Sequence, residues 1–422
     1  MVTDQDPERA GWEYKGLPPG SAAPLSELGS LGWNVLAGDT GTPVAILRAS
    51  ALASNVAIMT EFCQRHGVSL APHAKTTMSP ELTGMQLGAG AWALTAAVPH
   101  QVAALLAFGA RRILVANEVT DPGALRWLAG VLAAPGAPEV SWYVDSLAGV
   151  ELAAAALPAR PAGQRAQVLL EVGHRDGRTG ARTLGDALAV AEAASRCGRL
   201  DLIGVSGYEG TIGPGRDEAT LAKVDEFLVL MREVFEAVAG RGLLAGSPEP
   251  VVSAGGSTYF DRVVTELGPL RDRGARVVLR SGCYLAHDHG QYAGSSPDQL
   301  PGWDLGPFQP AIEIWGRVLS RPEPELALVN FGRRDVSFDA GLPVPVRWSP
   351  LSAPGALPAS DLTVTGLSDQ HAFVRVPAGH RIAPGDLLGA GISHPCTTFD
   401  RWRLLLITDD SYRVTGAART FF

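Results

Sequence analysis

Eight short apolar runs, each separated from the next by a longer segment, occupy the region from about residue 68 to residue 282. The runs are rich in β-branched and other apolar residues and end in small or polar ones. The longer segments space their apolar residues as amphipathic helices do, and several end in glycine. The runs are VSLAPHA (68–74), AWALTA (91–96), RILVAN (112–117), VSWYVD (140–145), AQVLLEV (166–172), LIGVSGY (202–208), EPVVSAG (249–255) and RVVLRSG (276–282).

This alternation predicts an α/β fold in which eight parallel strands close into a (β/α)8 barrel of the TIM type. An open doubly wound sheet of similar length is the competing interpretation. Its fingerprint, a glycine-rich turn after the first strand, is absent from the sequence. We therefore expect the barrel.

The pattern changes after residue 300, where strand-like segments are joined by Gly, Pro and Asp turns. This change predicts a second, mostly β domain with antiparallel strands. We assign residues 42–300 to the barrel, and residues 1–41 and 301–422 to the β-rich domain. The early apolar run at 42–50, which leads into the barrel region, is expected to belong to the edge of the second domain.

The composition excludes several classes of function. The net charge is −8, the pI is near 5.6, and no basic block marks a nucleic-acid surface. No apolar run approaches the roughly 20 residues of a membrane span, and the N-terminus lacks a signal-peptide core. The 4 cysteines have no paired spacing, which favours a reducing cytoplasm.

The ends of the last two barrel strands carry small and hydroxyl residues. In TIM-type barrels, function lies at the C-terminal ends of the strands, and phosphate groups commonly bind after strands seven and eight. Unhindered N–H groups and hydroxyls there can bind a phosphate, although Gly-Gly-Ser-Thr alone also suits a plain turn. The candidate phosphate ligands are Gly255, Gly256, Ser257, Thr258, Gly282 and Tyr284.

Lys75 follows the first strand, in PHAKT. A lone lysine after a strand is ordinarily solvated, but this one is expected to point into the barrel mouth. A desolvated lysine near other cations becomes a nucleophile towards carbonyl groups. A lysine opposite a phosphate site predicts pyridoxal phosphate (PLP), bound as an imine.

Six short motifs in order, across roughly residues 40–415, resemble the fold-type-III PLP enzymes. The similarity is greatest to the D-serine dehydratase-like and D-threonine aldolase-like groups, which are distant relatives of alanine racemase. The motifs are PHAKT (72–76), GRTG (177–180), SAGGSTY (253–259), RSGCY (280–284), SDQHAF (368–373) and SHPC (393–396).

The resemblance implies a role for each matching residue. Lys75 would be the Schiff-base lysine, Arg178 would lie near the phenolic oxygen of PLP, and Tyr208 would lie near its ring. His394 and Cys396 would bind a metal, with Zn2+ expected and another divalent cation possible in its place. Two departures, Thr77-Met78 after the lysine motif and Asp369-Gln370 before His371, affect the identity of the substrate more than that of the cofactor.

The His394-Pro395-Cys396 motif does not by itself indicate a metal, because such a pair is more often a satisfied histidine and a buried thiol. Proline disfavours a helix, and residues i and i+2 of an extended strand point to the same side, so both side chains could reach one ion. Two protein ligands would leave positions for water and substrate, as in catalytic zinc sites. A thiolate selects zinc, whereas the aldolases typically have an aspartate there.

These features predict a PLP- and zinc-dependent dehydratase of a D-β-hydroxy amino acid, yielding a 2-oxo acid and ammonia. Lys75 would take the α-proton, and His371 is a second catalytic candidate, although it also suits a structural role on a strand. The alternatives are a metal-dependent D-threonine aldolase, a racemase, or a PLP-binding protein without turnover. The resemblance also implies a homodimer, and D-serine, D-threonine and 3-hydroxyaspartate all fit as substrates.

Overall fold

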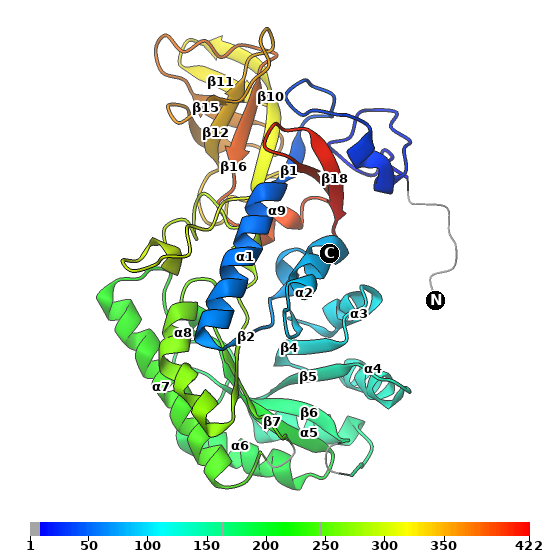
Figure 1. Ribbon diagram of the computed structural model, residues 1–422, viewed down its shortest axis with the longest axis vertical. Coiled ribbons are helices and arrows are strands. Elements are labelled where there is room, and N and C mark those ends of the chain that lie inside the picture. The colour runs from blue at the N-terminus through cyan, green and yellow to red at the C-terminus, as the bar shows by residue number, and fades with distance from the viewer. Residues whose placement is uncertain (1–8, 162–163, 245–246) are drawn as a thin grey trace.

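Two sheets organise the chain (Figure 1), which is described by a computed structural model over residues 9–161, 164–244 and 247–422. An eight-stranded sheet is wholly parallel, and a ten-stranded sheet is mostly antiparallel. The long helix α1 (Ala49–His66) runs from the second sheet to the barrel. The expected architecture, a barrel of the TIM type beside a β-rich unit, is confirmed.

The eight strands of the parallel sheet coincide with the eight predicted runs. Their spatial order is β2-β9-β8-β7-β6-β5-β4-β3. Between the two ends of this order, Trp92 N donates to Leu70 O over 2.7 Å and Thr95 N donates to Pro72 O over 2.9 Å, which closes the barrel. The strands are β2 (Ser69–Leu70), β3 (Leu94–Ala96), β4 (Arg112–Glu118), β5 (Glu139–Val144), β6 (Ala166–Val172), β7 (Leu200–Gly207), β8 (Val251–Ala254) and β9 (Arg276–Leu279).

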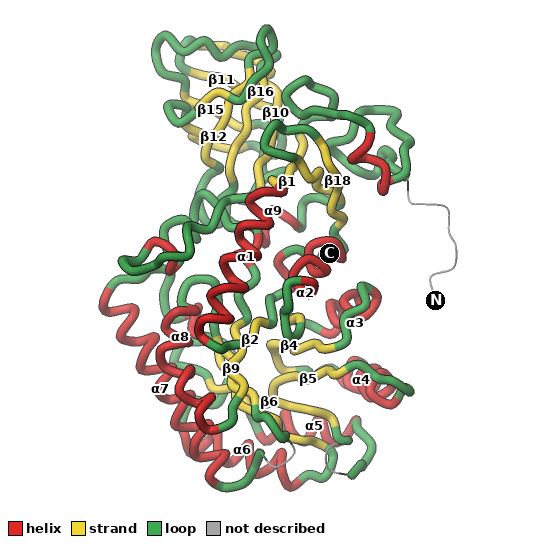
Figure 2. The backbone as a smooth tube through the Cα atoms, in the orientation of Figure 1, coloured by secondary structure: helices red, strands yellow, loops and turns green. Residues whose placement is uncertain are grey.

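Helices cover the outside of the barrel (Figure 2). Side chains of Ser79, Asp121, Ser146, Thr183 and Asp217 cap five of them by accepting hydrogen bonds from backbone N–H groups, as residues of these types do at helix starts. No helix in the described part of the chain is both long and apolar enough to cross a bilayer. The helices are α2 (Pro80–Gly88), α3 (Pro99–Ala107), α4 (Pro122–Ala133), α5 (Leu147–Ala156), α6 (Leu184–Arg196), α7 (Glu218–Gly240) and α8 (Phe260–Leu267).

The inside of the barrel is packed. The side chains that fill it form one buried cluster, to which every strand or its adjoining residue contributes, and this cluster leaves no open pore. A binding site must therefore lie at the rim. The cluster consists of Ala71, Ala93, Leu114, Tyr143, Leu169, Ile203, Val251 and Val278.

The second sheet unites both ends of the chain. Strand β1 pairs antiparallel with β10 and parallel with β17, so the run at 42–50 lies inside this sheet. The strand-like segments that the sequence shows after residue 300, at 311–322, 326–334, 361–377, 385–392 and 401–420, are confirmed as strands, whereas β12 and β13 lie outside them and were not predicted. The strands are β1 (Val44–Arg48), β10 (Ile312–Glu323), β11 (Leu326–Val329), β12 (Val344–Ser349), β13 (Leu357–Pro358), β14 (Thr363–Leu367), β15 (Ala372–Arg375), β16 (Leu387–Gly391), β17 (Leu404–Thr408) and β18 (Val414–Arg419).

Asn55, on α1, ties this helix to the two segments that follow the barrel. Its amide nitrogen donates to Leu285 O over 2.9 Å and to Gln309 O over 2.8 Å. Its amide oxygen accepts from Gln309 N over 2.7 Å. The Asn55 side chain and Leu285 are both buried, so the Leu285 carbonyl in particular depends on Asn55 for its hydrogen bond.

Replacing Asn55 with alanine should destabilise the protein. The substitution removes three hydrogen bonds and leaves the buried Leu285 carbonyl without a partner, which should lower the free energy of unfolding by about 2–4 kcal/mol. Urea denaturation followed by tryptophan fluorescence measures this loss. Gln64→Ala, at an exposed position of the same helix, is the matched control. An equal, small effect of both substitutions would contradict the role of Asn55.

Candidate active site

A cavity of about 400 Å³ lies at the rim of the barrel, and both halves of the predicted site line it. Lys75 comes from the barrel, and His394 and Cys396 come from the turn after β16. Lys75 is more than three hundred positions from His394 and Cys396 in the sequence. Of the predicted site residues, the cavity wall contains Lys75, Arg178, Tyr208, Gly255, Gly256, Ser257, Gly282, His394 and Cys396.

Lys75 and Arg178 both line this cavity without an anionic partner. Lys75 lies on the 3-10 turn η2 (Ala74–Thr76), close behind β2. Its ammonium forms no hydrogen bond or ion pair with any residue that the structure describes. The Arg178 guanidinium lies 4.7 Å from the centre of the Tyr208 ring and has no carboxylate partner among those residues either. Unpaired cations in one cavity suit an anionic ligand.

Two N–H groups of the glycine-rich turn that were expected to bind a phosphate already have a protein partner. The N–H groups of Gly255 and Gly256 donate to the buried Glu209 carboxylate, over 3.1 and 2.7 Å. The N–H groups of Ser257 and Gly282 donate to no residue that the structure describes, so they are free for a phosphate. A Cβ at Gly282 would lie 2.5 Å from His73 O, so only glycine fits there.

Three predicted site residues do not line the cavity. Tyr284 is buried, and its hydroxyl accepts from Gln86 Nε2 over 3.0 Å. The carbonyl of Thr258 accepts from the Arg216 guanidinium. His371 is exposed in the turn before β15. Tyr284, Thr258 and His371 therefore lie outside the cavity to which the sequence assigned them.

The expectation that 394–396 is an extended strand is wrong. Pro395 has φ −61° and ψ −46°, and Cys396 begins the short helix α9 (Cys396–Phe399). The fixed φ of proline suits the first turn of a helix, so here proline starts a helix instead of preventing one. The cavity wall nevertheless contains both His394 and Cys396.

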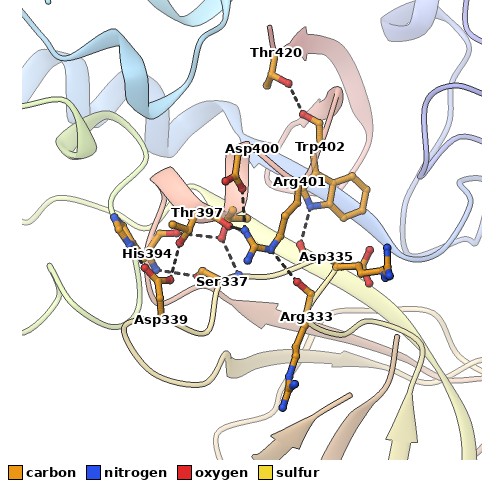
Figure 3. A network of polar contacts seen from close by, with 12 residues as sticks. Arg333, Asp335, Ser337, Asp339, His394, Thr397, Asp400, Arg401, Trp402 and Thr420 are labelled. Atoms are coloured by element: carbon orange, nitrogen blue, oxygen red, sulfur yellow. Dashed lines mark hydrogen bonds and ion pairs between the residues drawn. The ribbon is translucent and has the colours of Figure 1, made fainter. Parts of the chain in front are cut away.

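A polar network holds His394 in place (Figure 3). Its Nδ1 lies 2.7 Å from Asp339 Oδ2, and its backbone N–H donates to Ser337 Oγ over 3.0 Å. Asp339 also accepts from Thr397 Oγ1 over 2.6 Å. A carboxylate that binds one imidazole nitrogen leaves the other free for a metal, as in many zinc sites.

Two sulfur atoms meet at this turn. Cys396 Sγ lies 3.5 Å from Cys283 Sγ and 3.5 Å from Thr76 Oγ1. The contact with Cys283 holds the pKa of Cys396 well below its usual value, and it raises the pKa of the buried Cys283. Although burial opposes it, contact with Cys396 and Asp339 raises the pKa of His394 to about 9. A histidine and a thiolate are suitable ligands for zinc.

Sequence reasoning missed Cys283, Asp339 and Glu171, all at this site or next to it. Cys283 stands in the RSGCY motif at the end of the last barrel strand, a position that could have identified it. Glu171 lies near the C-terminal end of β6, a position that could also have identified it. Asp339 lies on an irregular segment, and its sequence surroundings carry no signal.

Glu171 belongs to an acidic cluster with Glu118 and Asp145. Their ligand atoms all lie within 4.8 Å of one another. Burial and the proximity of Glu171 raise the pKa of Glu118 to about 9. Glu118 is therefore protonated at neutral pH, which limits the negative charge beside the cavity.

Glu118 should make the stability of the protein depend on pH. In the folded protein it ionises at about pH 9, whereas an unperturbed carboxyl has the value 4.5, so stability should fall as pH rises between these limits. The glutamine in Glu118→Gln cannot ionise. The unfolding free energy of this variant minus that of the parent should therefore increase between about pH 5.5 and pH 8.5. Urea titrations at both pH values test this. The exposed Glu151→Gln should show no such trend, and parallel behaviour of the two variants would contradict the prediction.

Comparisons with known proteins identify relatives of this chain. The family of the alanine racemase N-terminal domain matches residues 47–260, and a serine dehydratase domain matches residues 311–408. The D-threonine aldolase of Arthrobacter is 27% identical over 87% of this chain and 89% of its own length. A 3-hydroxy-D-aspartate aldolase of Paracoccus denitrificans is 28% identical over 72% of this chain and 74% of its own.

Solved structures show the same fold. The D-threonine aldolase of Filomicrobium marinum superposes with a TM-score of 0.75 and 22% identity, covering 92% of this chain and 96% of its own. The D-threo-3-hydroxyaspartate dehydratase of Delftia superposes with a TM-score of 0.71 and 21% identity, covering 92% of this chain and 99% of its own. The chain thus belongs to the alanine racemase N-terminal domain family, and its barrel and β-rich sheet are those of the fold-type-III pyridoxal-phosphate enzymes.

Proposed function

We propose that the protein is a PLP- and zinc-dependent dehydratase that converts a D-β-hydroxy amino acid into a 2-oxo acid and ammonia. One observation carries this proposal: Lys75, His394 and Cys396 line the same cavity. The unpaired cations and free N–H groups support an anionic cofactor, and the histidine and thiolate support a soft metal ion.

The residues around the cofactor have distinct roles in this proposal. When bound, PLP supplies an electron sink for negative charge at the α-carbon. Lys75 would hold the cofactor, and its free amine would move the α-proton of the substrate. Arg178 would lie beside the phenolic oxygen, Tyr208 would lie near the ring, and Ser257 and Gly282 would bind the phosphate through their N–H groups.

The metal ligands would act on the β-hydroxyl. His394 and Cys396 would hold zinc, whose chemistry is to stabilise the departing hydroxide as a Lewis acid. Asp339 would hold the imidazole so that its Nε2 faces the ion. His371 is exposed outside the cavity, so we assign it no step in this chain.

Retro-aldol cleavage is the second candidate, because the curated relatives named above are aldolases. It would yield glycine and an aldehyde, and it needs a base for the β-hydroxyl instead of an acid for its departure. The thiolate at position 396 favours the dehydratase, because a soft donor selects zinc over manganese or magnesium. We further propose a cytoplasmic homodimer, in which the free cysteines would persist in reduced form.

Product analysis should distinguish the two reactions. We expect D-serine, D-threonine or D-threo-3-hydroxyaspartate to release a 2-oxo acid and ammonia, measured by a coupled dehydrogenase assay and chromatography. Chelation should abolish this release, and zinc should restore it. Release of glycine and an aldehyde would contradict the dehydratase and support the aldolase.

Two variants test the residues assigned to this reaction. Lys75→Ala should lose the visible absorption of bound PLP and reduce the rate by roughly 10³-fold or more. The exposed Lys223→Ala is the matched control and should keep both. Unchanged cofactor absorption in Lys75→Ala would overturn the assignment of the lysine.

A further inference from the structure

A second thiol lies beside the proposed metal site. Cys283 stands on the 3-10 turn η5 (Cys283–Leu285) after β9, and it lines the same cavity as Cys396. The two cysteines follow strands of different sheets, Cys283 after β9 and Cys396 after β16, yet their sulfur atoms are 3.5 Å apart. Thr76 Oγ1, next to Lys75, contacts both sulfurs, over 3.5 and 3.7 Å.

This separation suits two sulfur ligands of one ion. Zinc binds sulfur at roughly 2.3 Å in a tetrahedral shell, so two thiolates on the same ion lie roughly 3.8 Å apart. The observed distance of 3.5 Å is close to that value. A disulfide would need the sulfurs at about 2.05 Å, so the present spacing favours chelation over a covalent bond.

We propose that Cys283 is a third protein ligand of the metal, an inference that rests on the proposed binding of zinc by His394 and Cys396. In the part of the chain that the structure describes, the ligand atoms of these three side chains are not all within 4.8 Å of one another. Binding of the ion would therefore rotate the Cys283 or His394 side chain inward, and the thiol proton of Cys283 would pass to solvent.

Three protein ligands change what the site can do. A Cys2His set occurs in catalytic zinc sites and leaves one tetrahedral position open. The metal would then be held before the substrate arrives, and the substrate would supply a single oxygen. Two thiolates would also make the site prefer zinc, cobalt or cadmium to magnesium or manganese.

X-ray absorption at the zinc edge tests this directly, because it counts the sulfur atoms bound to the metal. The full-length PLP-loaded protein, stripped of metal and then given one equivalent of zinc, should show two sulfur ligands. Cys283→Ser and Cys396→Ser should each show one. Cys197→Ser, which changes the C-cap residue of α6 outside the cavity, should match the parent. In a chelator competition, Cys283→Ser should lose zinc affinity by about 10–100-fold.

The outcomes separate this inference from the proposed function. One sulfur in the parent, lost only in Cys396→Ser, would overturn the role of Cys283 and leave the dehydratase proposal intact. Binding of no zinc by the parent would overturn both. Retained PLP absorption and far-ultraviolet circular dichroism show whether Cys283→Ser is folded. If it is not, the sulfur count of the parent alone decides.

Discussion

The contact between the lysine turn and the turn at 393–396 is the constraint on which the site depends. Thr76 Oγ1, next to Lys75, lies 3.5 Å from Cys396 Sγ, and Lys75 and Cys396 line one cavity because the second sheet docks against the barrel rim at this point. Backbone hydrogen bonds fix the docking: His289 N donates to Ile392 O over 2.9 Å, and Gln291 N donates to Ser393 O over 3.2 Å. The segment after β9 thus contributes residues to the cavity wall and backbone hydrogen bonds to the residues before His394.

Arg280 is a buried arginine in the wall of the cavity, and it adds to the positive charge there. The Arg280 guanidinium donates to Ser253 Oγ over 2.7 Å, to Ser206 Oγ over 3.2 Å and to Gly207 O over 2.6 Å. These partners are neutral, so they do not cancel the positive charge of the guanidinium, which attracts an anionic ligand in the cavity. Together with Lys75 and Arg178, it favours a phosphorylated ligand, and protonation of Glu118 keeps the acidic cluster from cancelling that effect.

Local patterns predicted the barrel, because strand runs and helix caps are encoded in short windows. They also predicted Lys75, since the end of a strand places a side chain at the rim. The strands β12 and β13 were missed because prolines interrupt their runs. The prediction of an extended conformation at Pro395 was wrong because the fixed φ of proline suits the start of a helix as well as a strand. Asp339 reaches the site through long-range packing, which one sequence does not reveal, whereas the position of Cys283 at the end of the last barrel strand could have identified it.

The central claim is that one cavity holds both the cofactor and the metal. Anomalous X-ray scattering at the zinc edge, from crystals of the PLP- and zinc-loaded protein, tests it most directly. The account predicts a zinc peak at bonding distance from Cys396 Sγ and His394 Nε2, with density for the cofactor continuous with Lys75 Nζ. A zinc peak among Glu118, Asp145 and Glu171, with none at Cys396, would contradict it.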